Sequence, residues 1–318
     1  MKSDEAEASV VLNAGDVIKI QLGAQIDGFG TIVCDTIIVP GADSKHDEKR
    51  IADLMLATHY ANEVLLRLMV PRGLLATGTV EEKAKAAKAK SIPQSQMTSY
   101  LEKVCKTFDC NLVENTTSWV FERNEIEGKK KIVLAPGEQG KGEGLPEVGE
   151  VWGVEVGVSL GTGKLKNFEN RATLHRRTTL TYGLKRDSSK KTLNEVVKKF
   201  GTFPFSLRQL DDERTGKVGV VECVRGNVFR QYEVVGDKDN AAVARLLTTI
   251  GKLKCKPLNL CHLLIWNPAI TKNGITKLAT APALDVEKYQ SKTDKKLVDE
   301  EILKILEEPI AKPKKAKK

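Results

Sequence analysis

The 318-residue sequence contains no apolar run close to the eighteen or so residues that a membrane-spanning helix needs. Its first residues, MKSDEAEASVV, are acidic and polar, whereas a secretory signal peptide starts with basic and then strongly apolar residues. The six cysteines form no even framework, which is typical of a reduced, cytosolic or nuclear setting. These absences predict a soluble protein without a membrane partner.

Signals for catalysis are also scarce. There are four histidines, and His59 lies in a helical pattern where packing is a more common role than proton transfer. No serine lies in a G-x-S-x-G turn. The segment GTGK at 161–164 is not a phosphate-binding loop, because Val158 stands where the first glycine is needed and Leu165 replaces the magnesium-binding hydroxyl. No group of residues here favours general acid–base catalysis.

The segment 250–272 follows neither the helical nor the strand period, and we expect it to be irregular. Cys255, Cys261 and His262 lie close together in it, but a structural zinc site needs four ligands and no second pair is near. We therefore expect no metal and no other cofactor.

Positive charge is present and clustered. The net charge is +9, and the last ten residues, PIAKPKKAKK, hold five lysines and no acid. Clustered lysine favours a polyanion, with nucleic acid first and an anionic membrane second, although most single lysine runs are only solvated. KPKKAKK also resembles a nuclear-import signal. Further lysine clusters are Lys83, Lys85, Lys88 and Lys90, and Lys129 to Lys131. The residues predicted to bind nucleic acid are Lys312, Lys314, Lys315, Lys317, Lys318, Lys129, Lys130, Lys131, Arg176 and Arg177.

The hydrophobic pattern predicts an α+β protein, since strands and helices do not alternate regularly. Asp27 and Gly28 suit the turn of a hairpin over 15–39. Helices are predicted over 47–70, 80–90, 96–109, 190–200 and 293–308, with one more opening at FPFSLRQLDD, and strands within 111–131, 150–158 and 218–235. We assign residues 1–308 to one domain and 309–318 to a disordered basic tail.

Several segments in order resemble the proliferation-associated (ErbB-binding) protein family, including its fungal curved-DNA-binding type. They are GDVIKIQLGAQIDGFGTIV, NEIEGKKKIVLAPGE, EVGEVWGVEVGVSLGTGK, and FPFSLRQLDDE followed by GVVEC. The resemblance runs from about Lys2 to the lysine tail and is weakest across 244–272. It implies the pita-bread fold of type 2 methionine aminopeptidases, a curved antiparallel sheet layered with helices. Relative to the family, part of the N-terminal segment is missing.

The resemblance also places the aminopeptidase metal site on this chain, where two aspartates, one histidine and two glutamates would bind two metal ions. The matching positions are Gln21, Ile32, Ser118 or Trp119, Glu155 and Leu246. A pair of dications needs several anionic ligands, whereas glutamine is neutral and isoleucine offers no donor. Glu155 alone keeps its ligand type, so we expect an inactive relic of the site.

The resemblance implies a non-enzymatic protein that binds nucleic acid and ribosomes. Members of the family lack peptidase activity and associate with the large ribosomal subunit and its RNA, during biogenesis or on translating ribosomes, in the cytoplasm, nucleus and nucleolus. DNA is a further partner, and the sequence does not separate RNA from DNA. One alternative is a protein–protein adaptor that docks through the amphipathic helix at 299–308. The other is an active metallo-aminopeptidase.

Overall fold

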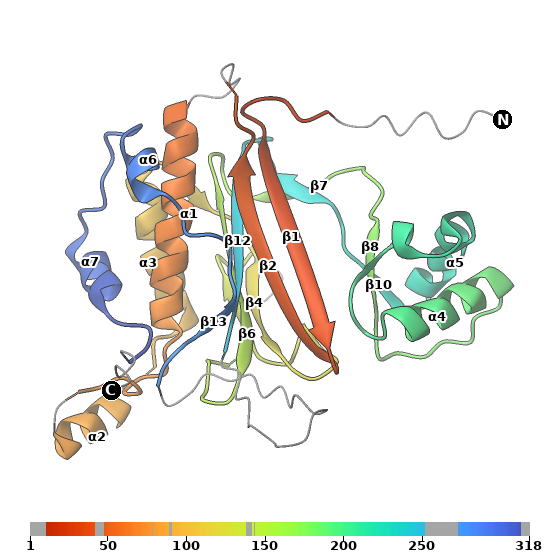
Figure 1. The fold of residues 1–318 in the computed structure, drawn as a ribbon, viewed down its shortest axis with the longest axis horizontal. Coiled ribbons are helices and arrows are strands. Elements are labelled where there is room, and N and C mark those ends of the chain that lie inside the picture. The colour runs from red at the N-terminus through yellow and green to blue at the C-terminus, as the bar shows by residue number, and fades with distance from the viewer. Residues whose placement is uncertain are drawn as a thin grey trace, which may run out of the picture.

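The computed structural model describes residues 11–41, 48–77, 79–88, 91–137, 142, 144–251 and 273–312. The described residues centre on an eight-stranded sheet whose strand pairs are all antiparallel (Figure 1). Its main path is β1 (Val17–Ile26), β2 (Phe29–Ile38), β12 (Val243–Ile250), β6 (Val151–Ser159), β4 (Thr116–Phe121) and β5 (Lys131–Leu134). Two short strands are added, β3 (Asn111–Leu112) beside β6 and β13 (Lys277–Ala279) beside β12.

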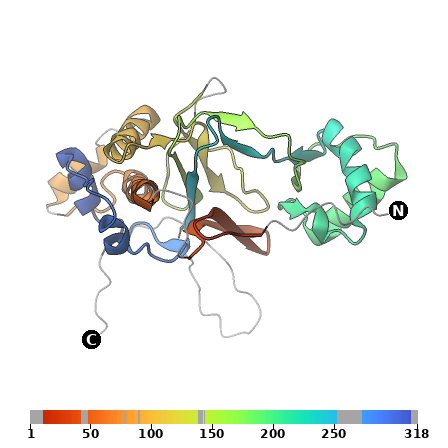
Figure 2. The same ribbon diagram turned by 90° about the horizontal axis from the view of Figure 1, so that it is seen from above.

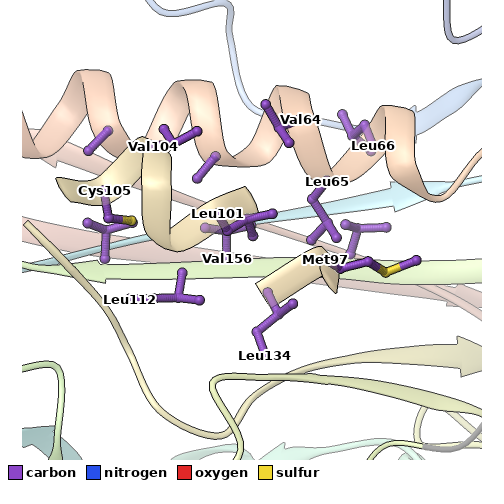
Figure 3. Close-up of a cluster of buried hydrophobic side chains, with 14 of the residues drawn as sticks. Val64, Leu65, Leu66, Met97, Leu101, Val104, Cys105, Leu112, Leu134 and Val156 are labelled. Atoms are coloured by element: carbon purple, nitrogen blue, oxygen red, sulfur yellow. The ribbon is translucent and has the colours of Figure 1, made fainter. Parts of the chain in front are cut away.

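One face of the sheet is covered by helices, and the main core lies between the two layers. The covering helices are α1 (Glu48–Leu68), α3 (Gln94–Thr107), α6 (Val286–Gln290) and α7 (Glu300–Glu307). The short helix α2 (Val80–Lys88) projects away from the sheet (Figure 1). Val154 and Val156 of β6 point to the same face and belong to one buried cluster with Leu65 of α1 and Leu101 of α3. Figure 3 shows Val156 beneath Leu101. This layered antiparallel arrangement confirms the predicted α+β pita-bread fold. Within the described residues no helix is long and apolar enough to cross a bilayer.

The predicted hairpin over 15–39 is present as β1 and β2. Asp27 and Gly28 form its turn with φ values of 53° and 84°. Two successive positive φ values match the right-handed twist of the strands, and this requirement explains the Asp-Gly pair. The register then places Gln21 opposite Cys34, so these two side chains lie on the same face.

Residues 164–234 form a second lobe on the far side of the sheet from α1 (Figures 1 and 2). The lobe contains β7 (Leu165–Asn167), β8 (Leu174–Arg177), α4 (Asp187–Lys199), β9 (Phe205–Ser206), a 3-10 turn (Leu207–Gln209), α5 (Glu213–Arg225) and β10 (Phe229–Gln231). β7 pairs with β11 (Val235–Asp237), whereas β8, β9 and β10 form their own sheet. Val196, Phe205 and Phe229 belong to a separate small core under α4 and α5.

The strand predicted over 218–235 is wrong over 218–225, which belongs to α5, and only 229–231 and 235 lie in strands. The valine-rich stretch resembled a strand, but the surrounding contacts select a helix. Asp212 caps its N-terminus by accepting the Thr215 N–H at 3.0 Å. A side chain at Gly219 would come within 2.4 Å of Thr192 and 2.6 Å of the Ser188 carbonyl on α4. Glycine there lets α4 and α5 approach closely.

Two predictions near the C-terminus also need correction. Residues 293–299 are not helical, because Thr293 and Lys295 instead bind the buried carboxylate of Asp53 at 2.6 and 2.8 Å. The folded part does not end at 308, since the Ile275 N–H donates to the Ile310 carbonyl and Lys312 donates its N–H to Asn273. The predicted irregular segment, with Cys255, Cys261 and His262, lies outside the described residues from 252 to 272.

Candidate functional site: a relic metal cleft and a basic lobe

A broad cleft of about 1190 Å³ opens on the face of the sheet opposite the helices. Its floor contains one row of residues across four strands: Gln21 of β1 lies opposite Cys34 of β2, Cys34 opposite Leu247 of β12, and Leu247 opposite Glu155 of β6. Residues directly opposite one another in antiparallel strands share a face. The register therefore brings Gln21 and Glu155 into the same cleft, as the family resemblance predicts.

Arg245 of β12 joins these two positions. Its Nε and Nη2 atoms bind the two carboxylate oxygens of Glu155 at 2.5 and 2.8 Å, and its Nη1 donates to Oε1 of Gln21 at 2.7 Å. Burial alone would lower the pKa of the Arg245 guanidinium, but the Glu155 carboxylate outweighs it and holds the pKa above its ordinary value. A fixed cation of this chain thus occupies the space between two former ligand positions.

The pleat of the strands separates the remaining predicted positions. Ile32 and Trp119 line the cleft, and the Trp119 ring lies 5.5 Å from the Lys131 ammonium. Ser118 faces the other way and is fully buried, with its Oγ accepting the backbone N–H of Glu155 at 3.0 Å. Of the two histidine alternatives, only Trp119 is therefore in the cleft.

Leu246 is not in the cleft either, and its prediction as a metal position needs correction. Alternate residues of a strand face opposite sides, and Val243, Arg245 and Leu247 are the β12 residues that line the cleft. Nothing in the local sequence singles out Arg245. Its role depends on the register of β12 against β6 and β1, two strands far away in the sequence.

The donor set does not fit a pair of metal ions. The cleft side chains at the five relic positions offer one carboxylate, Glu155, and a guanidinium already binds both of its oxygens. Glutamine is a poor ligand for a dication, and a nearby fixed positive charge repels one. Among the residues that the structure describes, no three His, Cys, Asp or Glu side chains form a group suited to a metal.

The GTGK turn is satisfied from within the chain. The carboxylate of Asp237 accepts the Gly163 N–H and the Ser159 hydroxyl, each at 2.8 Å. The Gly161 N–H donates to Ser159 Oγ at 3.0 Å. Backbone donors that a phosphate-binding loop would offer to a ligand are thus already used.

The predicted nucleic-acid residues of the folded part have different surroundings. Lys129 is exposed, whereas Lys130 pairs with Glu150 at 2.6 Å and Glu147 at 2.9 Å. Arg176 must be withdrawn from the set, because it is buried and paired with Glu125 and Glu127. In the tail, Lys312 is exposed, and Lys314, Lys315, Lys317 and Lys318 lie outside the described residues. Arg177 is half-buried in β8.

The helix at 299–308, predicted as a docking element, uses its apolar face within the chain. Ile302 is fully buried, and Ile305 and Leu306 pack against the main core. These contacts hold α7 beside α1 (Figure 2). Of the apolar residues in this helix, Leu303 is 40% exposed, so the adaptor hypothesis stays a prediction with a small apolar surface.

A stronger electrostatic feature was overlooked in the sequence. The second lobe, residues 164–234, holds sixteen lysines and arginines against eight acids, a net charge of +8. The other residues of the chain contain thirty-five basic and thirty-four acidic side chains, a net charge of only +1. We call residues 164–234 the basic lobe. Counting charge in long windows rather than in short lysine runs would have found it.

Comparisons with known proteins agree with the resemblance. A solved structure of a thermophilic Arx1 is 64% identical, with a TM-score of 0.87 over 98% of this chain and 79% of that chain. Curved DNA-binding protein of Schizosaccharomyces pombe is 31% identical over 100% of this chain and 73% of its own length. Proliferation-associated protein A of Dictyostelium discoideum is 29% identical, and the match covers 75% of this chain and 57% of that protein.

Similarity extends further to methionine aminopeptidase 2-2 of Colletotrichum graminicola, which is 26% identical over 76% of this chain and 50% of that enzyme. The chain matches no family model. These likenesses relate the chain to methionine aminopeptidases, while the relic metal positions on this chain stay a prediction.

Proposed function

The chain belongs to the proliferation-associated (ErbB-binding) protein family, and on that premise we propose that it is a non-enzymatic protein that binds nucleic acid and the large ribosomal subunit. It acts in the biogenesis of that subunit or on translating ribosomes, in the nucleus, nucleolus and cytoplasm. The likeness to a thermophilic Arx1 and the association of the family with large subunits support this proposal.

The observation that carries the proposal is the concentration of net charge +8 on the basic lobe. A surface that neutralises phosphates releases their counterions, and this release provides much of the free energy of nucleic-acid binding. Such contacts position a protein on RNA or DNA without reading a sequence. The lobe extends away from the sheet and its helix layer (Figure 2), so it can reach a large partner.

Peptidase activity is not part of the proposal. At the cleft, Arg245 holds Glu155, and the other relic positions supply no second carboxylate. DNA remains a second partner class, which the name of the Schizosaccharomyces pombe relative favours. Both partners would bind the same basic surface.

Sedimentation of the tagged protein through a sucrose gradient of cell extract tests the proposal. We expect the protein to migrate with large ribosomal subunits and to leave them at raised salt, since phosphate contacts weaken steeply with ionic strength. Migration only near the position of the monomer would contradict it. A nuclease digestion before the gradient distinguishes ribosome binding from binding to free nucleic acid.

A further inference from the structure

We propose that Tyr182 is a stacking platform for an unpaired RNA base, held beside the cations that bind the flanking phosphates. This inference rests on the proposed function and specifies how the basic lobe recognises its partner. Aromatic side chains in basic grooves bind single strands because every base presents a flat face for stacking.

Tyr182 stands out by its exposure. Its side chain exposes 53% of its surface, and every other Phe, Tyr or Trp among the described residues is buried or half-buried. The chain has only sixteen such residues, and the exposed one lies in the basic lobe. The exposed ring therefore lies in the part of the chain with the larger net positive charge.

The ring rests on the backbone of Gly226, directly after α5. A side chain at Gly226 would come within 2.8 Å of Cγ and Cδ1 of Tyr182. Glycine at this position therefore allows the ring to lie against the chain. The φ of Gly226 is −83°, which any residue adopts, so the contact rather than the backbone conformation calls for glycine.

The loop that carries Tyr182 is fixed at both ends. The Thr178 N–H donates to the Val228 carbonyl at 2.9 Å, and the Thr178 hydroxyl donates to the Asn227 carbonyl at 2.7 Å. At the other end, the Glu222 carboxylate accepts the N–H groups of Lys185 and Arg186 at 2.8 and 3.1 Å. A ring held in place loses little conformational entropy on binding.

Cations lie close to Tyr182 along the chain. Arg177 ends β8, Lys185 and Arg186 precede α4, and Arg225 directly precedes Gly226, against which the ring lies; the last three cations are exposed. Two acids belong to the same segments: Asp187 pairs with Lys190 at 3.7 Å, and Glu222 accepts the backbone N–H groups of the loop. The segments that carry and support the ring therefore hold more cations than unpaired acids, which suits a phosphate backbone passing over them.

The test compares binding of a fluorescein-labelled single-stranded RNA with binding of a duplex RNA of the same length, measured by fluorescence anisotropy. Replacing Tyr182→Ala is expected to weaken single-strand binding about 5-fold to 150-fold, the range for loss of one stacked base. Duplex binding should not change, because paired bases are not available for stacking. Tyr182→Phe keeps the ring and should bind as the wild type does.

Two further variants sharpen the test. Gly226→Ala keeps the tyrosine but displaces its ring, and we expect a selective loss on the single strand. Leu180→Ala is the matched control, because Leu180 is exposed in the same loop and has no ring. Circular dichroism and urea unfolding establish that each variant is folded.

Unchanged single-strand binding by folded Tyr182→Ala would overturn the inference, as would an equal loss on both RNA forms or an equal loss with Leu180→Ala. Tighter binding of a single-stranded DNA of the same sequence would overturn the assignment to RNA. If the wild type bound neither RNA form, the proposed function would fail as well. If the wild type binds both RNA forms and Tyr182→Ala binds them equally well, only this inference is rejected and the proposed function stands.

Discussion

Positive charge is paired inside the cleft but left exposed on the basic lobe. In the cleft, the guanidinium of Arg245 donates its hydrogen bonds to Glu155 and Gln21, the two predicted relic positions that it joins. In the basic lobe, the lysines and arginines outnumber the acids. Several of these cations are exposed, among them Lys185, Arg186 and Arg225. An internal cation stabilises the fold, whereas an exposed group of cations attracts a polyanion.

This difference shows what each group of cations does for the chain. Without Arg245, Glu155 would have no counter-charge on the sheet face, and a buried unpaired carboxylate is costly. Arg245 supplies that counter-charge from the neighbouring strand. The cations of the basic lobe outnumber its acids, so part of their charge is left for a polyanion.

Breaking the cleft pair should have the largest effect on stability. Arg245→Leu leaves Glu155 unpaired and is expected to lower the free energy of unfolding by about 2 kcal/mol, below the usual cost for fully buried pairs because Arg245 keeps some contact with water. Glu155→Gln in the same chain should restore most of the loss. Urea unfolding of the two single variants and the double variant measures this coupling, and additive effects would contradict it.

Removing charge from the lobe should have the largest effect on binding. We expect a quadruple glutamine variant to flatten the dependence of log K on log salt by about 3 units, since each phosphate contact contributes about 0.7–0.9. The replaced residues are Arg177, Lys185, Arg186 and Arg225. The matched control removes the same charge from the helix layer and should bind normally: Lys106, Lys288, Lys296 and Lys304. Equal losses from both variants would mean that the lobe has no special role.

The lysines of residues 313–318 are expected to contribute less than the lobe. Deletion of 313–318 removes four lysines and spares Ile310 and Lys312, which pair with residues 273–275. The slope should flatten by at most about 3 units, evenly for RNA and DNA, because phosphate contacts carry no sequence information. If binding is unchanged but nuclear accumulation is lost in cells, these lysines act as an import signal.

The loop under Tyr182 gives a pH-dependent prediction. Hydrogen bonds from the backbone of Lys185, from Ser189 and from the backbone of Arg186 lower the pKa of Glu222 from 4.5 to about 2. A carboxyl with a lowered folded-state pKa stabilises the fold above pH 4.5, and that contribution is lost as the pH falls toward 2. Glu222→Gln should therefore lower the urea midpoint at pH 7, with a difference that narrows between pH 4.5 and pH 3. A difference that is constant with pH would refute this role.

Restoring carboxylates to the cleft should have the smallest effect. In the double variant Gln21→Asp, Ile32→Asp, we expect no tightly bound metal and no release of N-terminal methionine, because Arg245 remains as a competing cation and histidine is absent. Elemental analysis after dialysis against cobalt measures the metal content. Close to two bound ions per chain would contradict the expectation, and so would metal-dependent peptidase activity.

The sequence predicted the elements that depend on neighbouring residues better than those that depend on contacts between distant segments. Asp27-Gly28 and the apolar period of α1 are local signals, and the hairpin and helix follow from them. The pita-bread fold came from the family resemblance rather than from local patterns. α5 was mistaken for a strand because its valines favour β structure, while the close approach of Gly219 to α4 is a tertiary contact.

The residues of the cleft also depend on contacts between distant strands, so the sequence predicted only some of them. Gln21, Ile32 and Glu155 line the cleft, and their assignment as relic metal positions stays a prediction. Leu246 was chosen one residue away from the cleft-facing positions, and Arg245 was missed, because only the strand register decides which side of β12 faces the cleft. Tyr182 could not be selected without knowing which aromatic rings are buried.

The most direct measurement is ultraviolet crosslinking of the ribosome-bound protein to RNA, followed by mass spectrometry of the crosslinked peptides. We expect crosslinks within the basic lobe, centred on residues 177–186 and 225, with Tyr182 among the modified residues. Crosslinks confined to the cleft around Trp119, with none in the lobe, would contradict the central claim that the basic lobe, and not the cleft, binds RNA.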